Sequence, residues 1–383
     1  MDWIFPARRW TVMISPRERC VAAIHLEEPD RVPCFELGVN LATIEKLINR
    51  PTVSAALGCM TSEELSTLAR DTVEAYAAAG LDMVPASAGF PENYRQGFVP
   101  ERIGPNRWID EFGRIWEDRP GLTGLSWYIG GTVKSRGDLE KIRAIDPEDP
   151  GRTSLARETI RSARQKGLAV MGYVDGPFLT AYMTVGLSDF LVKIYRDRGF
   201  ALELLELATR FNCVLAKRLT ESGVDGIIVG EDMADSHGPL INPRDLRSVM
   251  FPFLAREFDV IRRTGTPVMM HSDGNTMSVL EDIIALGIEG YQALEPDAGM
   301  DIAYIKERYG DKLCLLGNVD CGNTLTHGST HQVEAEAKHV IDSAAYGGGL
   351  ILGSSNSIHD GVKLENFLTM IRTGKKHGKY PLS

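Results

Sequence analysis

The feature that most constrains the fold is a pattern that recurs eight times along the chain. A short apolar run ends in polar residues and is followed by a helical stretch, and each run has the length and composition of a fully buried strand. Strands that alternate with helices predict a parallel sheet, and eight such units predict an α/β fold of the closed (β/α)8 barrel (TIM barrel) type. The eight runs are Val32–Leu37, Leu81–Ala86, Leu168–Tyr173, Gly226–Val229, Pro267–His271, Gly290–Leu294, Leu313–Gly317 and Gly349–Gly353.

A doubly wound open sheet is the alternative fold for such a chain. That fold places a glycine-rich phosphate-binding loop after a strand, and none of the eight runs is followed by one. We therefore favour the barrel. Ser15 and Thr61 each begin a capping box, the helical region from Leu187 to Ser222 is expected to break around Arg198-Gly199, and Asn242-Pro243 opens a helix that runs to about Arg263.

One segment departs from this rhythm. Residues 97–131 alternate aromatic and polar side chains between turn sequences, which predicts a β-hairpin or meander inserted at the rim between the second and third barrel strands. We expect one barrel domain over residues 15–383, because no linker or low-complexity segment divides it. Residues 1–14 are interpreted as an irregular extension and not a signal peptide, because a proline and two arginines interrupt their apolar stretch.

Composition excludes several classes of function. The 383 residues include 42 Lys and Arg against 52 Asp and Glu, a formal charge of −10, which argues against a nucleic-acid partner. No segment approaches 18 uninterrupted apolar residues, so no membrane span is expected. Six scattered cysteines without a CxxC pair fit reduced thiols and a cytoplasmic location. The oligomeric state, monomer or homodimer, stays open.

The candidate site follows from the barrel geometry, because the carboxyl ends of all the strands meet at one mouth. Acids, amides and one imidazole follow the predicted strands there. Each has a second interpretation: a polar residue after a strand is often a helix N-cap, His271 suits a core histidine, and Cys321 suits a small buried filler. The set is Glu36, Asn40, Asp175, Glu231, Asp232, His271, Ser272, Asp273, Glu295, Asn318, Asp320, Cys321, Ser354, Ser355, Asn356 and His359.

At these residues the chain resembles the uroporphyrinogen decarboxylase superfamily and, within it, the corrinoid-dependent methyltransferase branch. The similarity extends over nearly the whole chain from Ser15 and implies the same barrel. The segments that carry it are Ser15–Arg19, Glu28–Pro33, Trp108–Trp116, Glu231-Asp232, Gly238–Pro243, His271–Asn275, Glu295-Pro296, Gly317–Asp320, Gly353–Ile358 and Leu364–Phe367.

Two departures from the family pattern bear on function. The decarboxylases of the family carry an arginine-rich motif that grips tetrapyrrole carboxylates, whereas residues 32–40 offer Glu36 and no arginine. The thiol-methylating members hold zinc with a His-x-Cys and a distant Cys. Here Asp273 replaces the first cysteine, and the later position falls in residues 353–356, which contain no sulfur. A harder site of His271, Asp273 and an acid such as Glu231 or Glu295 is chemically compatible with Zn²⁺.

The resemblance implies a methyltransferase that moves a methyl group from a small methylated substrate, typically a methoxyaromatic, to the Co(I) of a separate corrinoid protein, as in an O-demethylase. We expect His271 and Asp273 to activate the ether oxygen, with Asp232 and Glu295 orienting the substrate or completing a metal site. Substrate contacts are expected from Glu231, Asn318 and Asn356, and an apolar wall from Tyr173, Phe178 and Tyr182, which equally suit plain packing.

Three other functions stay open at this point. They are methyl transfer from a methylcorrinoid to a pterin or thiol acceptor, a uroporphyrinogen decarboxylase-like decarboxylation, and an inactive barrel that binds a small ligand. The methyl donor's identity and the direction of transfer are not encoded in any motif of the sequence.

Overall fold

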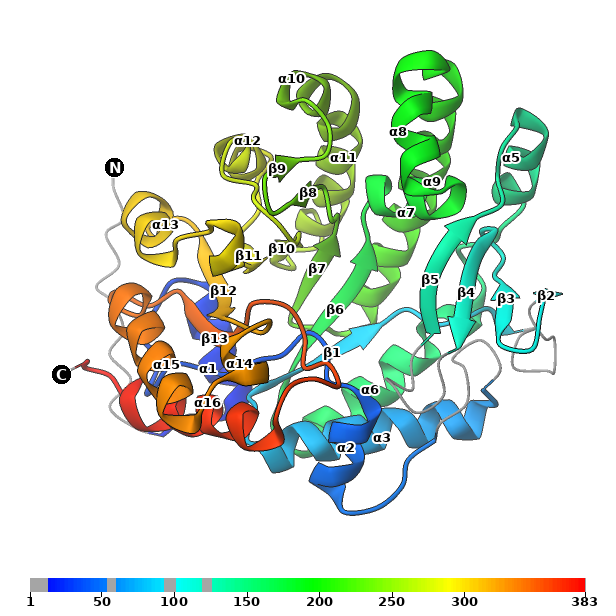
Figure 1. The fold of residues 1–383 in the computed structure, drawn as a ribbon. Coiled ribbons are helices and arrows are strands. Elements are labelled where there is room, and N and C mark those ends of the chain that lie inside the picture. The colour runs from blue at the N-terminus through cyan, green and yellow to red at the C-terminus, as the bar shows by residue number, and fades with distance from the viewer. Residues whose placement is uncertain (1–12, 54–59, 93–100, 119–125, 383) are drawn as a thin grey trace.

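The computed structural model describes residues 13–53, 60–92, 101–118 and 126–382. Its centre is a parallel sheet that curls into the wall of a barrel, with helices on the outside (Figure 1). This confirms the predicted barrel-type α/β fold. In spatial order the seven strands are β1 Met83–Ser87, β6 Ala169–Asp175, β7 Gly226–Gly230, β10 Val268–His271, β11 Gly290–Ala293, β12 Cys314–Val319 and β13 Leu350–Ser354.

The helices that surround this wall follow most strands in turn. They are α1 Pro16–Ile24, α2 Leu41–Ile48, α3 Ser62–Ala79, α5 Arg136–Arg143, α6 Ser154–Gln165, α7 Pro177–Val185, α8 Leu187–Arg196, α9 Arg198–Ser222, α10 Pro243–Asp245, α11 Phe251–Arg262, α12 Leu280–Ala285, α13 Ile302–Tyr309, α14 Thr324–His327, α15 Thr330–Ala344 and α16 Leu364–His377. Short helical turns cover Pro150–Thr153 and Pro296–Ala298, and a π-helical turn, Leu246–Met250, joins α10 to α11.

The helix boundaries follow local sequence signals. Ser15 and Thr61 form the two predicted capping boxes, in which the hydroxyl oxygen accepts from the N3 amide and the N3 glutamate accepts in return. Gly80 ends α3 in the left-handed conformation at φ 87°. The predicted break in the long helical region falls at Asp197, between α8 and α9.

The eighth barrel position is filled by backbone that forms no regular strand. In the predicted strand Val32–Leu37, only Cys34 makes a parallel bridge, to Leu352 of β13, so the prediction of a full strand there is wrong. Pro33 has no amide hydrogen with which to extend the ladder. On the other side, the amide of Asp82 donates to the carbonyl of Cys34 at 2.8 Å. Cys34 therefore lies between β13 and β1 and completes the circle.

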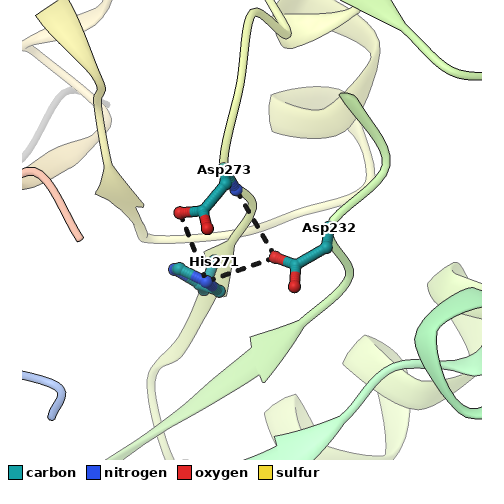
Figure 2. A group of neighbouring side chains, drawn as sticks. All are labelled: Asp232, His271 and Asp273. Carbon is teal, nitrogen blue, oxygen red and sulfur yellow. Dashed lines mark hydrogen bonds and ion pairs between the residues drawn. The ribbon is translucent and has the colours of Figure 1, made fainter. Parts of the chain in front are cut away.

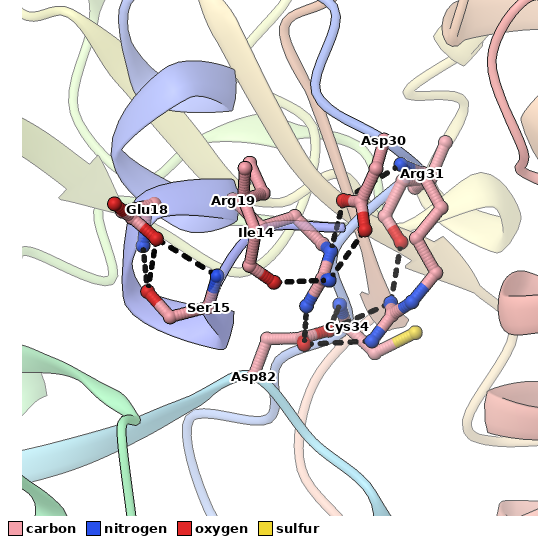
Figure 3. A network of polar contacts seen from close by, with 9 residues as sticks. Ile14, Ser15, Glu18, Arg19, Asp30, Arg31, Cys34 and Asp82 are labelled. Carbon is pink, nitrogen blue, oxygen red and sulfur yellow. Dashed lines mark hydrogen bonds and ion pairs between the residues drawn. The ribbon is translucent and has the colours of Figure 1, made fainter. Parts of the chain in front are cut away.

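A buried network of charges supports this closure (Figure 3). The carboxylate of Asp82, 1% exposed, accepts from the guanidinium groups of Arg19 at 2.7 Å and Arg31 at 2.8 Å, and from the amide of Cys34 at 2.8 Å. Arg19 is also paired with Asp30 at 2.6 Å. The side chain of Asp82 thus supplies a hydrogen bond that strand pairing would otherwise give.

Side chains alternate between two apolar clusters along each strand. Met269 of β10 lies in a cluster inside the barrel, together with Met171 of β6, while its neighbours Val268 and Met270 belong to the cluster under the helices. Cys20 of α1 packs into the interior cluster, as do Ala23 and Ile24. The helix α1 therefore seals the amino-terminal end of the barrel, and the carboxyl end stays open as the mouth.

The segment between β1 and β6 contains the predicted rim meander. Its strands pair in the order β2-β3-β4-β5, all antiparallel, and the sheet lies beside α7 (Figure 1). We call this four-stranded sheet the rim sheet: β2 Glu101–Arg102, β3 Arg107–Ile109, β4 Arg114–Asp118 and β5 Ser126–Gly131. A two-stranded hairpin, β8 Ala234–Asp235 and β9 Gly238–Pro239, follows β7. Among the described residues, no helix has the length and apolar character needed to cross a bilayer.

Candidate active site at the mouth of the barrel

Two neighbouring strands deliver three polar side chains to one point of the mouth. His271 is the last residue of β10, Asp273 follows it by two positions, and Asp232 follows the end of β7. The two strands are paired in register, with His271 opposite Gly230. Asp232 adopts φ 29°, a strained value for a residue with a side chain, of the kind often found at functional sites.

The three side chains face one another, and we call them the trio (Figure 2). Nε2 of His271 lies 3.3 Å from Oδ1 of Asp232 and 3.7 Å from Oδ1 of Asp273. One ligand atom from each residue lies within 4.8 Å of the others, the spacing of a possible metal site. The imidazole is 10% exposed and each carboxylate is 35% exposed, so the group is sheltered but open to the mouth.

Proximity shifts the acid–base behaviour of all three groups. Burial alone would lower the pKa of His271, but its hydrogen bond with Asp232 and the charges of both aspartates raise that pKa to about 9. Burial opposes ionisation of Asp232, yet the bond to His271 holds the pKa of that carboxyl below its usual range. Burial and the nearby charge of Asp232 raise the pKa of Asp273 to about 6, against the opposing effect of His271.

Three further side chains hold the trio in place. Nδ2 of Asn356, after β13, donates to Oδ2 of Asp273 at 2.7 Å. Glu295, after β11, accepts from the amide of Gly274 at 2.7 Å and so fixes the loop that carries Asp273. Gln292 of β11 presents its Oε1 to Nδ1 of His271. Of the predicted site residues, Asn356 therefore contacts the trio directly, whereas Glu295 binds the backbone of the loop that carries Asp273.

Glu231 is a correction to the predicted metal set. Its buried carboxylate turns away from His271 and accepts from the amides of Phe178 at 3.0 Å and Leu179 at 2.9 Å, at the start of α7. Gly176 makes this possible, because a Cβ there would lie 2.4 Å from Cδ of Glu231. Burial raises the pKa of Glu231 well above its usual range. Of the acids expected to complete a metal site with His271 and Asp273, which were Glu231, Glu295 and Asp232, the structure brings Asp232 into the group.

Two residues predicted to contact the substrate make structural contacts within the protein. Nδ2 of Asn318 donates to the carbonyl oxygens of Leu294 and Met300 and fixes the loop after β11. Phe178 is 1% exposed, and its ring packs against Tyr182 and Phe190 between α7 and α8. Packing of this kind was the alternative interpretation of Phe178, and the structure favours it.

Tyr173 and Tyr182 are partly buried within range of the charges of Asp175 and Asp232. After burial, the charges of Asp175 and Asp232 contribute most to raising the pKa of Tyr173 above its usual range, and the same two charges act on Tyr182. Tyr173 shares the barrel interior with Met171, two residues below it on β6. Gly230 leaves room for its ring, since a Cβ there would lie 2.1 Å from the tyrosine oxygen.

The rim sheet adds a residue that sequence reasoning missed. Arg114 of β4 reaches the end of β6 and pairs with Asp175 at 3.0 Å, while it also binds Asp110 at 2.6 Å. Its guanidinium carbon lies over the rings of Phe112 and Trp116, 5.0 and 5.4 Å from their centroids. Nothing in the local sequence distinguishes Arg114 from a surface arginine, because its partner Asp175 is 61 residues away.

Comparisons with known proteins agree with this picture. Residues 128–377 match the uroporphyrinogen decarboxylase (URO-D) family. The chain is 26% identical to the uroporphyrinogen decarboxylase of Anaeromyxobacter dehalogenans over 249 residues, which are 63% of this chain and 69% of that protein. It is also 26% identical to the methylcobamide:CoM methyltransferase MtbA of Methanosarcina mazei over 214 residues, which are 55% of this chain and 61% of that protein.

A solved structure shows the same fold over almost the full length. It is a methyltransferase from Methanosarcina mazei, with a TM-score of 0.71 and 19% identity over 95% of this chain and 99% of that one. The family match spans well over half of the sequence and includes all three residues of the trio. The chain belongs to the uroporphyrinogen decarboxylase (URO-D) family.

Proposed function

We propose that this protein transfers a methyl group from a small methoxyaromatic substrate to the Co(I) of a separate corrinoid protein. The chain belongs to the URO-D family and is similar to a methylcobamide:CoM methyltransferase, and this similarity supports methyl transfer as the reaction class. The observation that carries the proposal is the trio at the mouth, where two carboxylates face Nε2 of one imidazole.

The reaction needs an electrophile at the ether oxygen. Co(I) gives its electron pair to the methyl carbon, the carbon–oxygen bond breaks with its electrons on oxygen, and a phenolate leaves poorly unless a proton or a cation meets it. With a pKa of about 9, His271 is protonated at neutral pH and can give that proton from Nε2. Asp232 steadies the imidazolium, and the product is a phenol.

The trio also fits a divalent metal ion. Oδ1 of Asp273 is enclosed and has no hydrogen-bond partner among the described residues, although it faces Nε2 of His271. Nitrogen and oxygen donors suit Zn²⁺ without any thiolate. Nε2 of His271 and one oxygen each of Asp232 and Asp273 would hold the ion, which when bound supplies a Lewis acid for the same ether oxygen.

Substrate and partner are assigned to the rest of the mouth. Tyr173 and Tyr182 stand beside the aspartates and are proposed as the wall for the aromatic ring. The corrinoid protein is proposed to dock over the mouth beside the rim sheet, where Trp127 of β5 is 46% exposed. Co(I) chemistry and unpaired cysteines such as Cys213 suit the reducing cytoplasm, which is the proposed location.

Decarboxylation is the second candidate, favoured by the similarity to the Anaeromyxobacter enzyme. At the first barrel position, the described residues offer little that could bind a substrate with many carboxylates. Glu36 is buried there and accepts from Ser354, and Arg31 turns toward Asp82 at the sealed end of the barrel. An acidic mouth would repel a polyanion. Methyl transfer is therefore preferred.

The test is an anaerobic assay with Co(I) corrinoid protein and a panel of methoxyaromatics, alongside a metal analysis of the purified chain. We expect methylcobalt to form, one equivalent of phenol to appear, and H271A to lose at least about 100-fold in rate. The control is H339A, an exposed histidine on α15.

Full activity of H271A would remove the trio from the reaction. Demethylation of methylcobalt by an added pterin or thiol, with no reaction of methoxyaromatics, would reverse the proposed direction. Consumption of uroporphyrinogen would establish the decarboxylase instead.

A further inference from the structure

Gln292 is buried beside the trio but is not part of it. It is 3% exposed and lies on β11, directly opposite His271 in the register of β10 and β11. Register partners on neighbouring parallel strands point to the same face, so both side chains enter the barrel interior at one level. Oε1 of Gln292 meets Nδ1 of His271, on the side of the ring away from the aspartates.

This contact distinguishes the two nitrogens of the imidazole. With the amide oxygen of Gln292 against Nδ1, the contact is a hydrogen bond when Nδ1 carries the hydrogen, so it favours the Nδ1–H form of the ring. In the neutral ring the lone pair then belongs to Nε2, which faces Asp232 and Asp273. Metal-binding histidines generally have such an acceptor behind them, which fixes the tautomer and the orientation of the ring.

The uncharged amide suits this place better than a carboxylate. Asp232 and Asp273 already bring two acidic groups to Nε2, and Glu295 approaches the same loop. A further carboxylate behind the ring would add like-charge repulsion in a sheltered pocket. A glutamine accepts the hydrogen bond without that repulsion.

We propose that Gln292 is a positioning residue that keeps His271 in the Nδ1–H form and presents Nε2, with Asp232 and Asp273, to a divalent metal ion. The inference rests on the metal-binding role of the trio in the proposed function. Gln292 itself touches neither metal nor substrate in this assignment.

The experiment measures Zn²⁺ binding by the full-length apo chain in competition with a chromogenic chelator, at one fixed pH and without corrinoid or substrate. The variants are Q292L, which removes the acceptor at similar volume, and Q292E, which restores one. N366L is the matched control, because Asn366 is a fully buried amide on α16 that donates only to backbone carbonyls. Side-chain ¹⁵N spectra of histidine-labelled protein report the tautomer of His271, assigned by its loss in H271A.

We expect Q292L to bind Zn²⁺ about 10- to 100-fold more weakly and Q292E, which restores the acceptor but adds a charge, to recover part of that loss. N366L should lose stability and keep its Zn²⁺ affinity. Recorded above pH 9, where the imidazole is neutral, the wild-type spectrum should show the ring hydrogen on Nδ1. Equal affinity of Q292L and wild type, or a proton on Nε2 in the neutral apo form, would overturn the inference.

Failure of the inference and failure of the proposed reaction are separable. Zn²⁺ binding that H271A leaves unchanged overturns the role of Gln292, because the trio would then hold no metal. Methyl transfer by the same preparation is judged on its own by the Co(I) assay.

Discussion

Glu36 is a carboxyl group enclosed at the one barrel position that lacks a regular strand. It is 1% exposed, and its oxygens accept from the amide of Ser354 at 2.9 Å and from the hydroxyl of Ser354 at 2.6 Å. Burial outweighs these bonds and raises the pKa of Glu36 from its ordinary 4.5 to about 8. The side chain therefore links the first barrel position to β13 as a neutral acid through much of the ordinary pH range.

This shift predicts a pH dependence of stability. Between pH 4.5 and 8 the folded protein keeps a proton on Glu36 that the unfolded chain releases, so stability falls as pH rises through this window. The slope is about 1.4 kcal/mol per pH unit for one group. E36Q should match wild type near pH 4.5 and exceed it by a margin that grows up to pH 8 and then stays constant. Urea unfolding across pH 4.5–9 measures this.

The control for this experiment is E307Q, an exposed glutamate on α13. Its difference from wild type should not change with pH. A constant difference between E36Q and wild type over the whole range would show that Glu36 is ionised in the folded protein throughout.

Barrel geometry placed His271, Asp232 and Asp273 among the expected site residues, because all three lie at the ends of two strands that pair in register. It could not separate Glu231 from Asp232. Both follow β7, and the direction of Glu231 is set by the amides of α7, which the sequence places 53 residues earlier. Gln292 was missed because it lies inside an apolar run, although it is the register partner of His271.

At the scale of the element, the guanidinium of Arg114 joins the rim sheet to the end of β6. Arg114 spans from Asp110 within the rim sheet to Asp175 at the end of β6. Asp110 has other donors, including the amide of Phe112 and the indole of Trp116, whereas the carboxylate of Asp175 is paired with Arg114. Loss of Arg114 would therefore leave the carboxylate of Asp175 without its compensating positive charge.

R114A should destabilise the protein by about 2–3 kcal/mol, less than a fully buried pair because the Asp175 side chain is 29% exposed. Adding D175N should recover part of the loss, since it removes the uncompensated charge. R107A is the control: its pair with Glu117 is more exposed, with 55% of the arginine open, and should contribute less than about 1 kcal/mol. Urea unfolding gives these values, and no recovery in the double variant would contradict the ion-pair explanation.

The elements themselves were largely predictable. Seven of the eight apolar runs form barrel strands and the rim meander has its four strands, because burial and turn residues act locally. The first run, Val32–Leu37, does not form a regular strand, and the hydrophobic pattern of the sequence does not indicate why. Its alternation is correct, but Pro33 and the return of the chain toward α2 leave only the bridge at Cys34.

At the scale of the whole molecule, closure of the barrel depends on Asp82. Its carboxylate meets two guanidinium groups and the amide of Cys34 where the strand ladder is interrupted. A buried network in this place ties α1, the first barrel position and β1 to one another (Figure 3). The network is formed by residues 19, 31, 34 and 82, which do not form one continuous segment, so no local motif predicts it.

D82A should cost about 3–5 kcal/mol, because it leaves two buried cations without one of their anions. D82N should cost less, since an amide still accepts from Cys34. The control is R17A, whose pair with Asp225 has a half-exposed arginine and leaves Asp225 bound to Arg164. Differential urea unfolding compares the three, and a D82A variant as stable as R17A would exclude the network as the support of closure.

The seal that α1 forms at one end of the barrel gives the reaction a compulsory order. Cys20, Ala23 and Ile24 occupy the base of the interior, so the methyl donor, the corrinoid and the product must all use the same opening. A corrinoid domain docked over the mouth would block this opening. In the proposed reaction the aromatic substrate would therefore enter before the partner docks, and its phenol would leave only after the partner departs.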